Sequence, residues 1–167
     1  MDLTGRMAGR SSGATADRLA LRDLAESYAA AADARDTDLL VSLFTPDAVV
    51  SVHRADRDDP LAVFDGSAAL RGLVRVLADR YDATFHLVGN HRCQVTGDTA
   101  VAEAYCTAHH LHRGAAATPC DRQMLVRYAD TCVRGEDGLW RFRRRAVTSL
   151  WQSSHTVSGS LLDRADR

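Results

Sequence analysis

The side chains available for acid–base chemistry in this sequence are those of histidine, aspartate, tyrosine and arginine. All 21 basic residues are arginine, so a lysine Schiff base and a phosphate-binding loop of the Gly-Lys-Ser type are excluded. No G-x-G-x-x-G, G-x-S-x-G or H-E-x-x-H motif occurs, which removes the usual support for nicotinamide, serine-hydrolase and zinc-protease chemistry. Histidine, with an ordinary pKa of about 6.5, is the natural candidate for a general base.

The histidines differ in their surroundings along the chain. His86 lies in an otherwise apolar strand, where a lone histidine is more often a hydrogen-bonded core residue than a catalyst. Asn90 follows four residues later, so on a regular strand it faces the same side and either positions a substrate or caps a bulge. His110 continues an alternating row of small residues, so it is the second histidine expected to line a pocket, whereas His109 faces the other way.

A metal site is not expected, although His109, His110 and His112 are clustered. His110 and His112 share a strand face and would supply two ligands. No carboxylate recurs at ligand spacing, so the further ligands that a metal needs are missing.

The last strand alternates between arginines and aromatic residues. Arg141, Arg143 and Arg145 lie on one predicted face; they either bind an anionic group, such as a coenzyme A phosphate, or form an exposed or subunit-interface surface, which we favour. Arg144 shares the opposite face with two aromatic residues, so we expect it to be the arginine that reaches inward. Two further candidates for pocket walls, although core packing explains both, are Tyr128 and Trp151.

The composition limits the partners that the protein can have. A formal charge of -1 and a pI of about 6.6 give no general attraction for nucleic acid or for anionic membranes. No run approaches the roughly 20 apolar residues of a membrane span, and residues 1–14 lack the apolar centre of a signal peptide, so we expect a cytoplasmic protein. The four cysteines show no C-x-x-C spacing and are expected to be reduced.

Periodicity predicts one α+β domain over residues 15–157, between a disordered tail at 1–14 and a frayed tail at 158–167. Thr15 is the expected cap of the first helix and Ser67 of the third. The predicted order is ααββαββββ, with helices at 16–34, 38–44 and 67–81 and strands at 48–53, 61–64, 84–95, 99–113, 122–133 and 139–151. Three helices that cover the concave side of a strongly curved antiparallel sheet leave a pocket for a small molecule.

Three segments resemble the SnoaL-like branch of the nuclear transport factor 2-like superfamily. They are residues 24–33 (LAESYAAAAD), 43–48 (LFTPDA) and 84–90 (TFHLVGN). The resemblance covers about Leu19 to Trp151, and its motifs are most similar to those of scytalone dehydratase, hexachlorocyclohexane dehydrochlorinase and the bacterial bile-acid dehydratase. It implies a cone-shaped half-barrel, catalysis without a metal or other cofactor, and a homodimer or homotrimer formed through the convex face of the sheet.

The resemblance also implies the roles of particular residues. Asp33 matches the carboxylate of the family, His86 its general base, and Tyr28 a tyrosine that binds a substrate carbonyl. Residues five apart on a helix are rotated by roughly 140°, so Tyr28 and Asp33 cannot both occupy the centre of one face. His110 corresponds, within a shift of one or two residues, to a second pocket histidine of scytalone dehydratase.

These expectations describe a cofactor-independent dehydratase or isomerase that removes a proton next to a carbonyl in an apolar polycyclic or polyketide-like small molecule. A SnoaL-like cyclase of natural-product biosynthesis would use the same base. A non-catalytic binding or adaptor domain is the alternative of another class, because fold does not fix function. Contact between Asp33 and His86 distinguishes the enzymes from the adaptor, which has no need of it.

Overall fold

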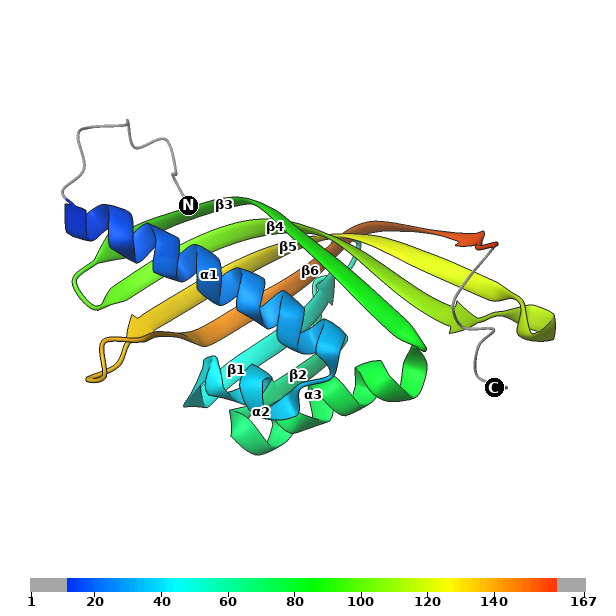
Figure 1. The fold of residues 1–167 in the computed structure, drawn as a ribbon, viewed down its shortest axis with the longest axis horizontal. Helices are drawn as coiled ribbons and strands as arrows, with labels where there is room; N and C mark the ends of the chain where they lie inside the picture. Colours follow the sequence, from blue (N-terminus) through cyan, green and yellow to red (C-terminus); the bar gives the residue numbers. More distant parts are fainter. Residues whose placement is uncertain (1–11, 159–167) are drawn as a thin grey trace.

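The computed structural model describes residues 12–158, and within them the predicted order of elements is confirmed. The helices are α1 (Ser12–Ala34), α2 (Thr37–Ser42), α3 (Gly66–Arg80) and a short 3-10 turn, η1 (Ala115–Ala117). The strands are β1 (Phe44–Arg54), β2 (Ala62–Asp65), β3 (Ala83–Thr96), β4 (Thr99–Arg113), β5 (Pro119–Arg134) and β6 (Trp140–Thr156). Three helices and six strands form an α+β fold (Figure 1).

The six strands form one mixed sheet in the order β2-β1-β6-β5-β4-β3. The expectation of a wholly antiparallel sheet is wrong at one position, because β1 pairs with β6 in parallel. The cause is the connection through α3, which carries the chain from β2 at one edge of the sheet to β3 at the other edge. Three successive hairpins then return the chain to β1, and β6 arrives there in the same direction as β1.

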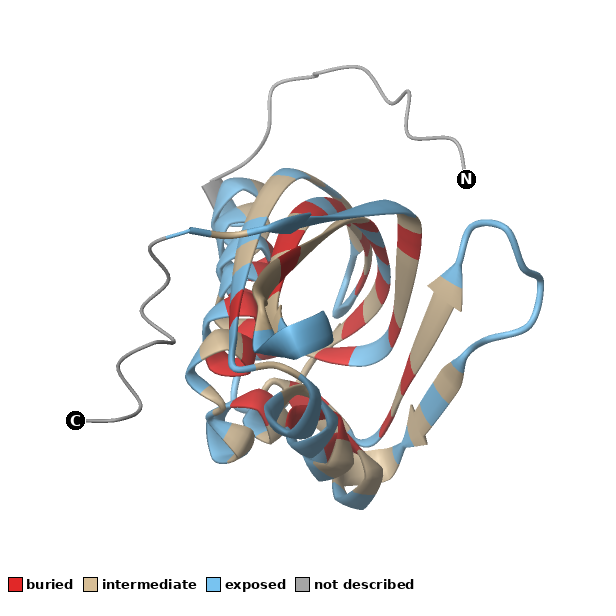
Figure 2. Ribbon diagram, turned by 90° about the vertical axis from the view of Figure 1, so that its right-hand side faces the viewer, coloured by how far each residue is buried: buried red, intermediate tan, exposed pale blue. Residues whose placement is uncertain are grey.

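The sheet is strongly bent, and the helices lie on its concave side. In Figure 1, α1 runs across the strands while α3 lies beside β1 and β2. Seen from the end in Figure 2, the sheet curls around an interior in which the buried residues gather. The strands leave the barrel open on one side, so the molecule has the predicted cone-like, unclosed form.

Small residues on β4 let the helices pack closely against the sheet. Its inner face carries buried Ala100, Ala102, Ala104, Cys106 and Ala108, as the alternation in sequence predicts. The facing helices contribute larger apolar side chains to the core. They are Leu21, Leu24 and Tyr28 on α1 and Leu70, Leu73 and Val74 on α3.

The helix starts differ in part from those expected. Helix α1 begins at Ser12, so Thr15 lies within it; the alanines around Thr15 favour helix and extend it by a turn. Asp36 caps α2, its Oδ1 accepting the backbone N–H of Leu39 at 2.9 Å. Ser67 lies inside α3 and donates to the carbonyl of Pro46 at 3.5 Å instead of capping the helix. Of the predicted tails at 1–14 and 158–167, residues 1–11 and 159–167 fall outside the described residues, whereas residues 12–14 belong to α1 and not to a disordered tail.

Candidate active site

Asp33 and His86 are in direct contact. Asp33 lies in the last turn of α1 and His86 near the start of β3, and the Oδ1 atom of Asp33 is 2.6 Å from Nδ1 of His86. The second oxygen, Oδ2, accepts the backbone N–H of His86 at 2.8 Å. Two bonds from one residue to one carboxylate fix the strand against the helix end and fix the orientation of the imidazole.

The carboxylate of Asp33 is held in its charged form by further donors. Thr84 donates its hydroxyl to Oδ1 at 2.8 Å, and this hydroxyl in turn accepts a bond from Nη1 of Arg35 at 2.7 Å. Partial burial acts to raise the pKa of Asp33, but the hydrogen bonds from His86 and Thr84 outweigh it and lower the pKa below its ordinary value.

Arg35 occupies an uncommon backbone conformation just beyond the end of α1. Its φ of 57° lies in the left-handed region, which costs free energy for a residue other than glycine. The guanidinium also donates to the carbonyl of Ala32 at 2.6 Å, a carbonyl of the last helical turn that accepts the backbone N–H of Arg35 at 3.3 Å as well. Arg35 therefore links the helix end to the hydroxyl that holds Asp33.

The charge of Asp33 determines the tautomer of His86. A carboxylate only accepts hydrogen bonds, so Nδ1 carries the proton and Nε2 keeps a free lone pair. The side chain of His86 is only 8% exposed, and that of Asp33 is 23% exposed. This arrangement gives a base at Nε2 and stabilises the imidazolium that forms when the base accepts a proton.

His110 contacts His86 on the inner face of the sheet, as predicted. The two rings are nearly perpendicular, with centroids 5.5 Å apart, and the ring of Tyr81 also contacts that of His110, with centroids 4.5 Å apart. Burial, with smaller contributions from His86 and Arg122, lowers the pKa of His110 to about 4, so its imidazole is neutral at pH 7. Its Nδ1 is 3.4 Å from the carbonyl of Arg122, which can only accept; Nε2 is thus left as an acceptor.

A second histidine and aspartate pair lies on the outer face of the same sheet. His109 Nδ1 is 2.6 Å from Oδ2 of Asp121, the same distance as in the inner pair. His155 approaches the same oxygen at 3.6 Å, and the side chains of His109 and His155 are 31% and 56% exposed. Of the two neighbouring histidines, His110 therefore faces the interior and His109 faces outward.

Tyr28 lies in the aromatic core. Its ring makes edge contacts with Phe44, Tyr128 and Phe142, with centroids 5.9–6.2 Å apart, and the residue is 5% exposed. Burial raises the pKa of its hydroxyl. This packing favours a structural role for Tyr28 and for Tyr128, which is 2% exposed, over contact with a substrate.

The arginine that reaches inward from β6 is Arg145, not Arg144. Adjacent residues of β5 pair with Phe142 and Arg144, so Arg143 is an extra residue that forms a β-bulge. The bulge reverses the alternation after Phe142, which exposes Arg144 and buries Arg145. The predicted inward orientation of Arg144 is therefore wrong, because the alternation was assumed to be unbroken.

Arg145 forms a fully buried ion pair. Its Nε and Nη2 atoms each donate to Asp130 at 2.8 Å. The guanidinium also lies over three aromatic rings, with distances of 3.9–4.4 Å to the centroids of Tyr28, Tyr128 and Phe142. This cluster fills the centre of the core beyond the dyad.

Asn90 lies at another bulge, and its side chain leaves the inner face. Gly89 pairs with Tyr105 and Arg92 with Glu103, so two residues of β3 stand opposite one of β4. Asn90 has a φ of 49° and is exposed. The expectation that it shares a face with His86 is thus wrong, and the open alternative that it belongs to a bulge is confirmed.

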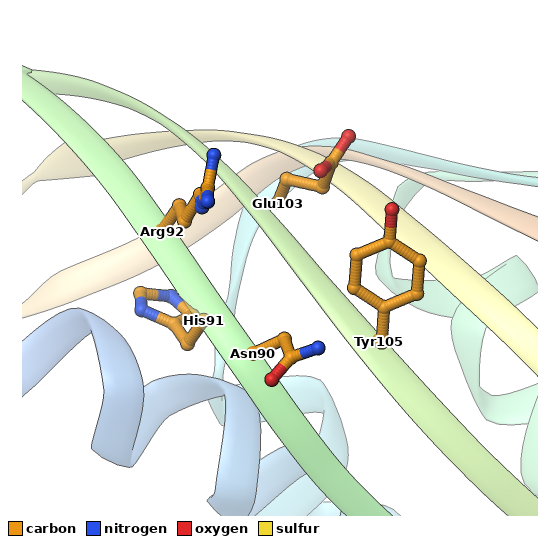
Figure 3. Close-up of a pocket in the computed structure, with 5 residues that line it drawn as sticks. All are labelled: Asn90, His91, Arg92, Glu103 and Tyr105. Atoms are coloured by element: carbon orange, nitrogen blue, oxygen red, sulfur yellow. The ribbon is translucent and has the colours of Figure 1, made fainter. Parts of the chain in front are cut away.

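A pocket of about 430 Å³ lies beside this bulge. It is lined by Asn90, His91, Arg92, Glu103 and Tyr105, and Figure 3 shows Asn90 beside Tyr105 and His91 directed toward α1. Glu103 and Tyr105 alternate with the buried alanines of β4, so these two lining residues lie on the outer face of the sheet, opposite to the face that carries the dyad.

Trp151 is 64% exposed and pairs with Leu125 on the outer side of the sheet, so neither a pocket wall nor core packing describes its place. A second bulge in β6, next to Leu125, changes the alternation there as well.

Within residues 12–158, no group of three or more histidine, cysteine or carboxylate side chains is arranged to hold a metal. None of the helices in this range is long and apolar enough to cross a membrane.

Comparison with known families decides the classification. The sequence profile of the SnoaL-like domain matches residues 13–146. The chain belongs to the SnoaL-like family. An uncharacterized protein of Mycobacterium tuberculosis is 32% identical over 141 residues, which cover 81% of this chain and 87% of that protein. A relative from Mycobacterium bovis matches equally well.

Solved structures share the fold of this SnoaL-like domain. A proposed scytalone dehydratase from Novosphingobium aromaticivorans has a TM-score of 0.72 at 22% identity and covers 86% of this chain and 91% of its own. A proposed aromatic ring hydroxylase from the same organism has a TM-score of 0.71 at 26% identity, with coverages of 86% and 94%. A hexachlorocyclohexane dehydrochlorinase from Novosphingobium barchaimii has a TM-score of 0.70 at 18% identity, with coverages of 88% and 94%.

Several residues around the dyad of this SnoaL-like domain were not identified from sequence. Thr84 lies within the family-like segment at 84–90, two residues from His86, so its position was a usable signal. Arg35 lies just after one predicted helix and Tyr81 is the last residue of another, and nothing in their spacing indicates a site. The sequence indicates Arg122 only as the start of a strand, whereas its register with His110 places it on the inner face.

Proposed function

We propose that this SnoaL-like protein is a cofactor-independent lyase or isomerase in which His86 removes a proton from carbon next to a carbonyl group. The observation that carries the proposal is the 2.6 Å contact between Asp33 and Nδ1 of His86, which leaves Nε2 as the base. The expected substrate is an apolar ring compound of small size, because apolar side chains make up most of the concave core.

The chemistry follows from the tautomers of His86 and His110, each of which leaves Nε2 without a proton. Nε2 of His86 accepts the α-proton, and the charged Asp33 stabilises the resulting imidazolium while the electron pair of the C–H bond forms an enolate. In a dehydration, this pair then forms a carbon–carbon double bond as the β-hydroxyl leaves, and the proton held by His86 converts hydroxide to water. His110 keeps an acceptor at Nε2, which would orient the substrate hydroxyl.

The names of two structural neighbours agree with this reaction class. One is a proposed scytalone dehydratase and the other a hexachlorocyclohexane dehydrochlorinase; both names describe eliminations. A cyclase would begin with the same proton removal and differ only in the electrophile that the substrate supplies. An adaptor domain gives no reason for a charged carboxylate and a shielded imidazole in contact at a helix end.

Deuterium exchange tests the proposal without knowledge of the leaving group. Bicyclic ketones such as 1-tetralone and 2-tetralone are incubated with the protein in deuterated water, and loss of the α-proton signal is followed by NMR. We expect His86→Ala to lower the exchange rate by about 10²–10⁴, the usual contribution of a general base. The matched control is His109→Ala, which removes a histidine with an equal carboxylate contact on the outer face. Equal rates in the two variants would refute the proposal.

A further inference from the structure

Arg122 brings a positive charge to the inner face of the sheet. It stands directly opposite His110 in the antiparallel register of β4 and β5, so both side chains project from the same face. His110 in turn contacts His86. Arg122 therefore belongs to the surroundings of the dyad, although it makes no contact with Asp33.

Arg122 has no carboxylate partner among residues 12–158, in contrast to three other arginines that are shielded from solvent. Arg134, Arg141 and Arg145 each hold an aspartate at 2.7–2.8 Å. The Nε atom of Arg122 is buried and has no hydrogen-bond acceptor in the described part of the chain. A buried donor without an acceptor is costly, so its presence calls for an explanation, and a bound ligand is one.

The carboxylates of the interior, and that of Asp121 next to Arg122, already have other partners. Asp33 is bound to His86, and Asp121 projects to the outer face and contacts His109. Asp130 is bound in both oxygens by Arg145. The charge of Arg122 is thus not balanced by a carboxylate on the inner face within residues 12–158.

We propose that Arg122 binds a carboxylate of the substrate, so that the substrate class is an apolar ring compound with one acid group. A guanidinium and a carboxylate form paired hydrogen bonds, and Nε is one of the atoms that such a pair uses. Neighbouring strands are about 4.8 Å apart, so the step from β3 to β5 places the acid group roughly one ring system, about 5–10 Å, from the reacting carbon. The inference rests on the proposed function, since it takes the ligand of Arg122 to be the substrate of His86.

Equilibrium binding of 2-naphthoate and of its neutral methyl ester tests this inference. The two probes share one ring system and differ in charge. We expect calorimetry to show that the wild-type protein binds 2-naphthoate at least tenfold more tightly than the ester. Arg122→Gln should remove this preference and Arg122→Lys should retain part of it. Arg127→Gln, an exposed position on the outer side of the same strand, should keep the full preference.

A wild-type protein that binds the acid no more tightly than the ester would overturn the inference, and so would Arg122→Gln with an unchanged preference. Circular dichroism establishes that each variant is folded, and the shift of the arginine Nε–H signals in NMR on addition of 2-naphthoate gives an independent readout in the wild type. The same titration with His86→Ala separates the two proposals. An unchanged preference there supports the anion site even if the exchange assay refutes the role of His86.

Discussion

At the scale of residues, surroundings distinguish two pairs that are alike in geometry. His86 with Asp33 and His109 with Asp121 have the same 2.6 Å contact. The inner pair is shielded, receives a further hydrogen bond from Thr84 and touches a second, neutral histidine. The outer histidine is about one-third exposed, so water competes for its proton and charge. Only the inner pair has the environment that a general base for an apolar substrate requires.

His110 predicts a dependence of stability on pH. Its pKa of about 4 in the folded protein lies below the ordinary value of 6.5, so between these values the unfolded chain binds a proton that the folded chain does not. The contribution of His110 to the free energy of unfolding is therefore fully present above pH 6.5 and is lost as the pH falls toward 4. The loss between pH 7 and pH 4.5 amounts to about 2–3 kcal/mol.

His110→Gln tests this prediction, because glutamine does not titrate. Urea denaturation at pH 7 and at pH 4.5 should show a smaller fall in the free energy of unfolding for the variant than for the wild type. A variant whose stability falls as steeply as that of the wild type would show that another group is responsible. His155→Gln, an exposed histidine of the outer face, is the control.

At the scale of elements, bulges decide which side chains reach the interior. The alternation of β4 is regular, so the inward face of His110 could be predicted from sequence. Strands β3 and β6 contain bulges, and beyond them the predicted faces of Asn90 and Arg144 are wrong. A bulge depends on pairing with the neighbouring strand, which a single sequence does not record. The pairing of Asp33 with His86 was likewise not visible in spacing, and the resemblance to a family supplied it.

The bulge at Arg143 has an energetic consequence that can be measured. Arg145→Met leaves Asp130 charged and buried without its partner, so we expect a loss of about 3–5 kcal/mol in the free energy of unfolding. The neighbouring Arg144→Met should change stability by less than about 0.5 kcal/mol, because Arg144 is exposed. The double variant Arg145→Met with Asp130→Leu should recover much of the loss.

Urea denaturation of the three variants measures these changes. Similar losses for Arg144→Met and Arg145→Met would contradict the assignment of Arg145 to the interior. No recovery in the double variant would mean that packing over the three aromatic rings, and not the unpaired charge, accounts for the loss.

At the scale of the whole molecule, the two faces of the sheet differ in what covers them. The inner face is covered by helices, but the outer face carries an exposed apolar row. Leu87, Leu125 and Trp151 are linked across the strands by register, with Leu87 and Trp151 62% and 64% exposed. Phe85 and Tyr105 extend the row at 58% and 41% exposure. Apolar surface of this kind commonly marks an interface between proteins.

We propose that the expected homodimer or homotrimer forms through this outer row. Analytical ultracentrifugation should give a multiple of the 18.2 kDa of one chain, and Leu87→Glu should lower the mass toward that of a single chain. Leu139→Glu, an equally exposed leucine at the turn before β6, should leave the assembly intact. A wild-type mass of 18.2 kDa at micromolar concentration would contradict this proposal.

The order of elements and the concave cover of helices could be predicted at this scale, because helical and strand periods change clearly along the chain. The parallel pairing of β1 with β6 could not. It depends on the edge of the sheet to which α3 delivers the chain, and that choice is made by packing of the whole molecule. The elements of this SnoaL-like fold can thus be predicted from sequence, but the long-range pairing of its strands cannot.

The central claim is that Asp33 orients His86 as a base and stabilises the imidazolium that forms. Its most direct test is the ketone exchange rate of Asp33→Asn. An asparagine of the same shape cannot stabilise the imidazolium, so the rate should fall by on the order of 10²–10⁴, while Asp121→Asn on the outer face should exchange at the wild-type rate. An Asp33→Asn protein that is folded and exchanges as fast as the wild type would contradict the claim.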